Sequence, residues 1–190
     1  MNANRLRLHT PALGKSTGDD LAVLGAMLQG FAQACVDLNV VAGSRAHELI
    51  EDIDIMQWYP FEHLREIEKM VMNSYQNPAV ILERVGIEMM RTWYQFGPGK
   101  EIIKTGIEFL HFQAGSQGYA SVVRGPEMMV GSFELREFDE EDRRAVIHST
   151  TPFQKDLERG VIIGGMSAPG DLDLVDVDNS EYANLFYVEF

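Results

Sequence analysis

The sequence predicts an α+β fold in which an N-terminal helical layer packs on a mainly antiparallel sheet of about five strands, interrupted by one helix. The first observation is a change of period. Up to Gly115 apolar residues recur at helical spacing, and after it they alternate as in half-buried strands. The second is the stretch from Arg143 to Met166, where a strand leads through a Ser/Thr turn into a further helix.

Helical spacing of apolar residues dominates the first half of the chain. Asn77 and Pro78 supply a cap and a first helical position for the longest of these segments, and Gly97 ends it. Gly25 weakens the first segment and leaves open a strand start within 21–27. The predicted helices cover residues 24–38, 44–50, 60–71, 77–96 and 99–110.

Alternation of apolar and polar residues defines the second half. Turns are expected at Gly125-Pro126 and at the acidic segment 139–142. The predicted strands cover residues 119–124, 130–138, 143–148, 172–177 and 185–190.

One helix interrupts these strands. Ser149, Thr150 and Thr151 supply hydroxyls that can cap it, and Pro152 suits its first position. Small residues allow a close approach of backbones, so its glycines predict tight packing against another element. These glycines are Gly160, Gly164 and Gly165.

Length and composition limit the function classes. The 190 residues fit one domain, expected over 19–190, preceded by a flexible arm over 1–18. A formal charge of −13 argues against nucleic acid as a partner, because phosphate contacts dominate such binding. A single cysteine, Cys35, excludes an internal disulfide and most cysteine-based metal sites. No apolar run reaches the roughly 18 residues of a membrane span. We therefore expect a cytoplasmic protein without a metal.

The order of elements resembles the superfamily that joins haem-nitric-oxide/oxygen-binding (H-NOX) domains, vinyl-4-reductase domains and the ligand-binding modules of bacterial aromatic sensors. The resemblance extends over nearly all of 21–190 as a pattern of elements. It implies a ligand cavity between the helices and the sheet. The segments that carry it are Asp52-Ile53-Asp54 with Phe61 to Met72, Ile87 to Trp93, Phe109-Leu110, and Ile147 to Gly165.

The chain departs from this superfamily at the positions that carry chemistry. Haem-binding members hold the propionates with a Tyr-x-Ser-x-Arg motif, and here Ile147, Ser149 and Thr151 correspond to it. Their proximal histidine follows the Phe-Leu pair, whereas His111 is near that pair at a different spacing. Zinc-binding relatives use cysteines in the final third, where this chain has none. The resemblance therefore implies the fold but no bound cofactor, with haem on His111 as the alternative.

A group of aromatic and methionine side chains forms the candidate ligand site. Two neighbouring predicted helices carry these residues, and aromatic residues there either fill the core or line the cavity that the resemblance implies. His111 is either an axial ligand or a histidine with hydrogen bonds to backbone or water. The candidate ligand-binding residues are Met89, Trp93, Phe96, Phe109, His111 and Phe112.

No catalytic constellation stands out. His148 and Ser149 are adjacent in a strand and point to opposite faces, so they are poorly placed to act as a base and a nucleophile. The sequence thus favours a non-enzymatic, stand-alone bacterial sensory protein that encloses a small apolar or aromatic ligand. No kinase or DNA-binding segment is attached, so the output is expected to be a separate protein.

The alternative is a dimerising assembly module without a small ligand, as among vesicle-tethering members of the same superfamily. The predicted helix over 24–38 is apolar over a wide arc, which favours a homodimer.

Overall fold

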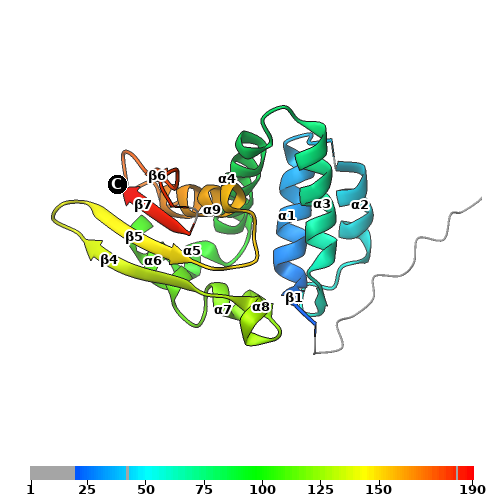
Figure 1. Cartoon of the computed structure of the whole chain (residues 1–190), viewed down its shortest axis with the longest axis horizontal. Coiled ribbons are helices and arrows are strands. Elements are labelled where there is room, and N and C mark those ends of the chain that lie inside the picture. The colour runs from blue at the N-terminus through cyan, green and yellow to red at the C-terminus, as the bar shows by residue number, and fades with distance from the viewer. Residues whose placement is uncertain (1–19, 42, 183) are drawn as a thin grey trace, which may run out of the picture.

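The computed structural model describes residues 20–41, 43–182 and 184–190. It confirms the α+β class, with helices first and a four-stranded antiparallel sheet after them (Figure 1). The predicted arm over 1–18 lies outside the described residues.

Three helices form the N-terminal layer. They are α1 (Gly25–Asp37), α2 (Gly43–Asp52) and α3 (Glu62–Ser74), and they lie side by side in Figure 1. Leu28, Phe31 and Cys35 project from α1 into the core and are fully buried. Much of the apolar arc of α1 is thus buried within the fold, and the homodimer stays a prediction.

A small three-stranded sheet lies at the end of this layer that is lowest in Figure 1. Its strands are β1 (Ala22–Leu24), β2 (Trp58–Pro60) and β3 (Val123–Arg124), in the order β2-β1-β3. The strand start near 21–27 is therefore present as β1. The predicted strand over 119–124 is mostly wrong, because its first part is the short helix α7 (Tyr119–Val122). Tyr119 is almost fully buried there, and α8 (Glu127–Val130) follows β3.

The long helix α4 (Pro78–Phe96) begins at the expected proline. The predicted helix over 99–110 is instead two helices, α5 (Gly99–Ile102) and α6 (Gly106–Ala114). The break has a local cause at the start of α6. The Thr105 side chain accepts a hydrogen bond from the Glu108 N–H at 3.1 Å, and the Asp171 carboxylate accepts one from the Gly106 N–H at 3.0 Å. Capping of these free N–H groups stabilises a new helix start.

The main sheet has four strands rather than about five, in the order β4-β5-β7-β6. They are β4 (Phe133–Asp139), β5 (Arg144–Ser149), β6 (Asp176–Asp178) and β7 (Leu185–Glu189), and all neighbours are antiparallel. On β5, Ala145, Ile147 and Ser149 are buried while the residues between them are more exposed. This alternation places one face of the sheet against the helices.

The helix that interrupts the sheet is α9 (Lys155–Ser167). The expected caps are wrong. Gln154 holds the N-cap position without a side-chain cap, and the Ser149 and Thr151 hydroxyls donate to the carboxylate of Glu158 instead. A carboxylate attracts hydroxyl protons more strongly than a neutral partner does, so these side chains turn toward it.

The expected close packing of α9 is confirmed, and its main partner is α4. A Cβ at Gly160 would collide with the carbonyl oxygen of Glu83, and one at Gly164 would lie 2.7 Å from the Cα of Ile87. Across the interface, a Cβ at Gly86 would collide with the carbonyl oxygen of Leu157. The two backbones therefore approach at distances that only glycine allows.

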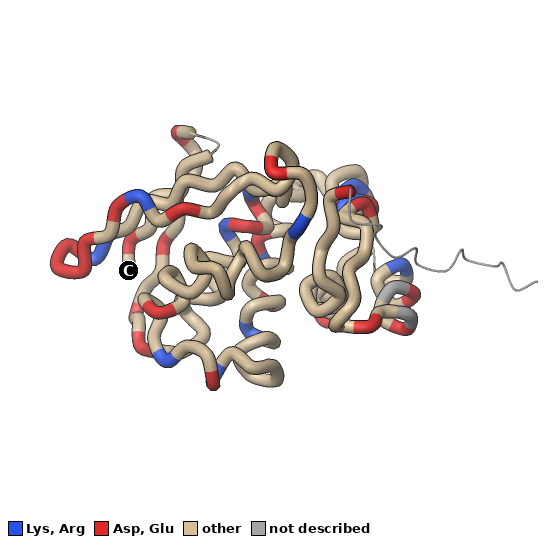
Figure 2. Tube along the Cα trace, turned by 90° about the horizontal axis from the view of Figure 1, so that it is seen from below, with Lys and Arg blue, Asp and Glu red and all other residues tan. Residues whose placement is uncertain are grey.

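Acidic residues are spread over the surface and concentrate at the turn between β4 and β5 (Figure 2). No helix in the described part of the chain is long and apolar enough to cross a membrane.

Candidate functional site

A cavity of about 590 Å³ lies between α1 of the helical layer and the elements α4, α7 and α9. Ile55 and Phe96 contribute to it and are both exposed, which places them at its rim. The remaining lining residues are Ala26, Met27, Gln29, Gly30, Gln33, Met89, Met90, Thr92, Trp93, Gly97, Pro98, Phe112, Gln113, Gln117, Gly118, Tyr119, Val122, Phe153, Leu157, Glu158 and Val161. A cavity with largely apolar walls and a few polar groups is typical of a small-molecule site.

Four of the six candidate ligand-binding residues line this cavity: Met89, Trp93, Phe96 and Phe112. The rings of Trp93 and Phe112 stack with their centroids 5.6 Å apart and an angle of 23° between their planes. Stacking of this kind fixes both rings, so α4 and α6 together form one rigid aromatic wall.

The other two candidates lie elsewhere. Phe109 is fully buried in the core between α6 and α9, where its ring lies over Gly165. His111 is exposed, and its ring packs edge-on against Phe138 of β4 with centroids 5.0 Å apart. Neither residue belongs to the cavity lining.

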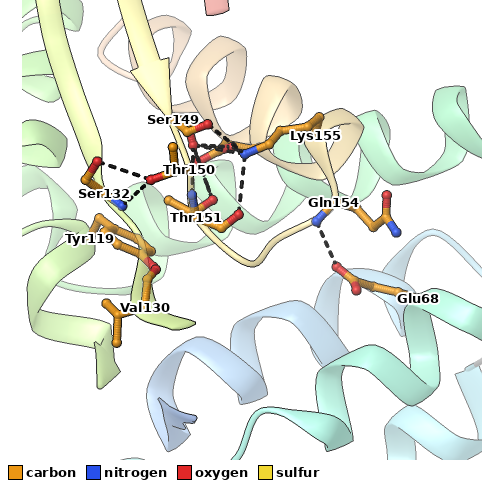
Figure 3. Close-up of polar contacts among 10 residues, drawn as sticks. Glu68, Tyr119, Val130, Ser132, Ser149, Thr150, Thr151, Gln154 and Lys155 are labelled. Atoms are coloured by element: carbon orange, nitrogen blue, oxygen red, sulfur yellow. Dashed lines mark hydrogen bonds and ion pairs between the residues drawn. The ribbon is translucent and has the colours of Figure 1, made fainter. Parts of the chain in front are cut away.

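Tyr119 of α7 contributes to the cavity wall. Its hydroxyl donates a hydrogen bond to the carbonyl oxygen of Val130, a pair drawn in Figure 3. Burial, and after it the nearby carboxylate of Glu158, raises the pKa of Tyr119 above its ordinary value. Tyr119 is therefore a neutral phenol whose proton is already engaged.

A buried polar cluster lies where β5 leads into α9. The Glu158 carboxylate accepts hydrogen bonds from the Ser149 hydroxyl at 2.7 Å and from the Thr151 hydroxyl at 2.9 Å. It also pairs with the Lys155 ammonium group at 2.9 Å. Figure 3 shows Lys155 reaching back to Ser149, whose hydroxyl and carbonyl oxygens lie 3.1 and 3.2 Å from its Nζ. The side chains of Ser149, Thr151 and Glu158 are almost entirely shielded from solvent.

Glu158 is the one charged residue in the described lining of the cavity. The sequence reasoning missed it, although its position carried a signal. It lies next to Leu157 and three residues before Val161, within the apolar stripe that faces the core. A carboxylate inside such a stripe must find buried partners, because an isolated buried charge is very costly.

A second buried carboxylate connects the helical layer to the start of α9. Glu68 of α3 accepts a hydrogen bond from the Gln154 N–H at 3.3 Å (Figure 3). Burial raises the pKa of Glu68 to about 7, and that hydrogen bond and the charge of Arg65 only partly oppose the increase.

Comparison with known proteins identifies the fold. No protein-family model and no curated protein sequence matches the chain. Solved structures do match. A variant of Tt H-NOX has a TM-score of 0.63 at 15% identity, with 88% of this chain and 94% of that chain covered. An oxygen-binding H-NOX domain related to soluble guanylate cyclases, in its oxygen complex, has a TM-score of 0.59 at 15% identity, with 86% and 90% covered.

The chain has an H-NOX-like fold. A third match, a structure used to probe haem distortion in the H-NOX family, has a TM-score of 0.61 at 15% identity over 87% of this chain and 94% of that chain. The resemblance read from the order of elements is thereby confirmed at the level of the fold.

Three features of the described residues differ from a haem site. The described cavity lining includes no histidine, and Cys35 lies in the core outside it with a pKa raised by burial to about 12. The hydroxyls of Ser149 and Thr151, at the positions of the propionate motif, are engaged by Glu158. In the described part of the chain, no group of three or more His, Cys, Asp or Glu side chains is placed to hold a metal ion.

Proposed function

We propose that the protein is a non-enzymatic sensor that encloses a small apolar or aromatic molecule in the cavity, holds no haem, and signals to a separate protein. The observation that supports this most strongly is the cavity itself. It has about 590 Å³ of space, an aromatic wall fixed by Trp93 and Phe112, and adaptable methionines beside it.

The burial of the hydroxyl groups supports a binding role over catalysis. Ser149 is fully buried, and its proton is directed at Glu158, so a substrate has no access to its oxygen. His148 lies on the other face of β5, where its Nδ1 is 3.3 Å from Arg136. A nucleophile and a base within reach of each other and of a substrate are thus not assembled here.

Charge supports the proposal that no haem is held. A haem brings two propionates, which need cationic or hydrogen-bonding partners. At this end of the cavity the Glu158 carboxylate already accepts hydrogen bonds from the Ser149 and Thr151 hydroxyls and pairs with the Lys155 ammonium group. Added carboxylates would compete with Glu158 for the same donors and would be repelled by it.

The position of the cavity supports a signalling role. Met27 and Gly30 of α1 and Met89 and Trp93 of α4 all line it, so the cavity borders both helices. A ligand that contacts both sides changes the relative free energies of conformers in which these elements are closer or further apart. A partner protein that binds one conformer more tightly would then bind more or less strongly when the ligand is present.

The first experiment tests occupancy. We expect native mass spectrometry of the purified protein to show a small-molecule adduct, and organic extraction to release an apolar or aromatic compound. The matched variant is Gly30→Leu. Gly30 lines the cavity, and a Cβ there meets a single neighbouring atom, Met89 Cγ at 3.6 Å, so the leucine side chain extends into free space.

Gly30→Leu should fold normally and lose the adduct. Replacing a helical glycine also raises helix stability by up to about 1 kcal/mol, so its melting temperature should not fall. An adduct that persists in Gly30→Leu would show that the molecule binds elsewhere. A wild-type protein that carries no adduct and binds no apolar aromatic probe would contradict the proposal.

A further inference from the structure

We propose that the ligand donates a hydrogen bond to Glu158: it is an apolar or aromatic molecule with an O–H or N–H group, neutral or cationic, and not an anion. This inference rests on the proposed function, because it assigns a chemical class to the occupant of the same cavity.

The hydrogen-bond capacity of Glu158 carries the argument. A carboxylate has about four acceptor positions on its two oxygens. Three protons reach them: one from Ser149, whose oxygen lies 2.7 and 2.8 Å from the two carboxylate oxygens, one from Thr151 at 2.9 Å, and one from Lys155 at 2.9 Å. Ser149 has a single hydroxyl proton, so it serves one oxygen at a time. These three protons leave one acceptor position unfilled on a carboxylate whose residue lines the cavity, and we assign that position to the ligand.

Lys155 cannot supply the missing donor. Its ammonium group has three protons, and four oxygens surround it: the Ser149 hydroxyl and carbonyl, the Thr151 carbonyl at 3.4 Å, and Glu158. Its attraction to Glu158 balances the two charges, and its three protons are shared among these four oxygens. Glu158 lines the cavity and Lys155 does not, so a ligand meets the carboxylate rather than the ammonium group.

The residues around Glu158 indicate that the rest of the ligand is apolar. Phe153, Leu157 and Val161 flank the carboxylate in the cavity wall, and the aromatic pair of Trp93 and Phe112 faces the same space. Polar lining residues such as Gln29 and Gln113 are only partly buried. A single donor at one end of an apolar body matches this distribution, since a second buried polar group would lack a shielded partner.

The test uses four probes with the same ring system: 2-naphthol, 2-methoxynaphthalene, naphthalene and 2-naphthoate. Binding is followed by quenching of tryptophan fluorescence, because Trp93 lines the cavity, and by calorimetry. We expect 2-naphthol to bind at least about tenfold more tightly than 2-methoxynaphthalene, as a hydrogen bond to a charged acceptor warrants. Naphthalene should resemble the methoxy compound, and 2-naphthoate should bind most weakly.

Two variants complete the test. In Glu158→Gln the negative charge is lost, and the preference for 2-naphthol over 2-methoxynaphthalene should fall to about threefold or less, with 2-naphthoate binding relatively better. Asp156→Asn removes the same charge from the same turn of α9 at a residue outside the cavity lining, and should keep the wild-type preference. Circular dichroism and thermal melting verify that both variants fold.

The outcomes separate the two proposals. If the neutral probes bind equally well to wild-type protein, or if Glu158→Gln folds and keeps the full preference, the assignment of a donor to Glu158 is overturned while the cavity remains a binding site. If none of the probes binds and Gly30→Leu changes nothing, the proposed function fails together with it. Should Glu158→Gln not fold, the comparison of 2-naphthol with 2-methoxynaphthalene in the wild type decides alone.

Discussion

Glu68 shows how one buried side chain makes the stability of the protein depend on pH. The residue is 4% exposed, and its carboxyl accepts one hydrogen bond from the backbone N–H of Gln154. Because burial disfavours the charged form, the pKa rises to about 7 from an ordinary value of 4.5. The folded protein therefore holds this proton more tightly than the unfolded chain does.

The sign of the resulting pH dependence follows directly. Protonated Glu68 contributes its full stabilisation below pH of about 4.5, and the contribution is lost as the pH rises to about 7. Glu68→Gln removes the titration but keeps an acceptor for Gln154. We therefore expect the free energy of unfolding of the variant, relative to wild type, to improve by about 2 to 3 kcal/mol between pH 5 and pH 8.

Urea unfolding at both pH values measures this difference. The control is Glu66→Gln on the same helix, whose exposed carboxylate pairs with Arg45. It should follow the pH dependence of the wild type. An equal effect of Glu68→Gln at pH 5 and pH 8 would count against the raised pKa.

At the scale of elements, the contact between α4 and α9 is determined by glycine. The backbones approach closely at Gly86, Gly160 and Gly164, and the ion pair between Arg159 and Glu83, 3.1 Å long, lies beside them. This contact positions Leu157, Glu158 and Val161 along the cavity wall. The geometry of the site therefore depends on residues that do not line it.

Gly160→Ala tests this dependence. The added methyl group would collide with backbone of α4, which cannot rotate away as a side chain can, so the helices must separate. Overpacking of this kind costs about 1–3 kcal/mol, and we expect a loss of stability in that range or above it. Gly30→Ala is the matched control: its Cβ meets open space apart from Met89, and the substitution should stabilise α1 by up to about 1 kcal/mol. Thermal unfolding measures the stability of both variants. Equal changes in melting temperature would show that the close approach of α4 and α9 does not require glycine at position 160.

The elements themselves also show what the sequence could predict. Periodicity located α1, α3, α4 and β5 because each carries a regular apolar face. It failed at Tyr119–Val122, where a four-residue helix is too short to show a period, and at Thr105, where a cap restarts the helix. The glycines of α9 predicted close packing but not its partner, since the contact with α4 spans distant parts of the sequence.

The candidate site was predictable only in part, for a related reason. Aromatic and methionine residues such as Met89, Trp93 and Phe112 were recognisable as a group. Whether a given side chain faces the cavity or the core depends on the rotation of its helix, and this separated Phe112 from Phe109. The Glu158 cluster required knowledge of which hydroxyls fold back onto α9, which local capping preferences predicted wrongly.

At the scale of the whole molecule, fold and residue chemistry lead to different expectations about haem. The fold matches H-NOX structures with TM-scores of 0.59 to 0.63. The described cavity wall, however, carries a carboxylate and no histidine, and the chain has a formal charge of −13. Long-range repulsion and the local competition at Glu158 both act against a ligand that brings two further negative charges.

We therefore expect purified protein, expressed with an ample haem supply, to show no stoichiometric Soret band, and haemin added to it to bind no more tightly than to an unrelated acidic protein. An absorbance spectrum with a pyridine haemochrome assay measures both. His111→Ala is the informative variant. Because His111 packs on Phe138 outside the cavity, this substitution should leave the spectrum unchanged. A stoichiometric band that disappears in His111→Ala would mean that α6 turns this histidine inward to hold iron, and the assignment of the cavity to a haem-free ligand would then be wrong.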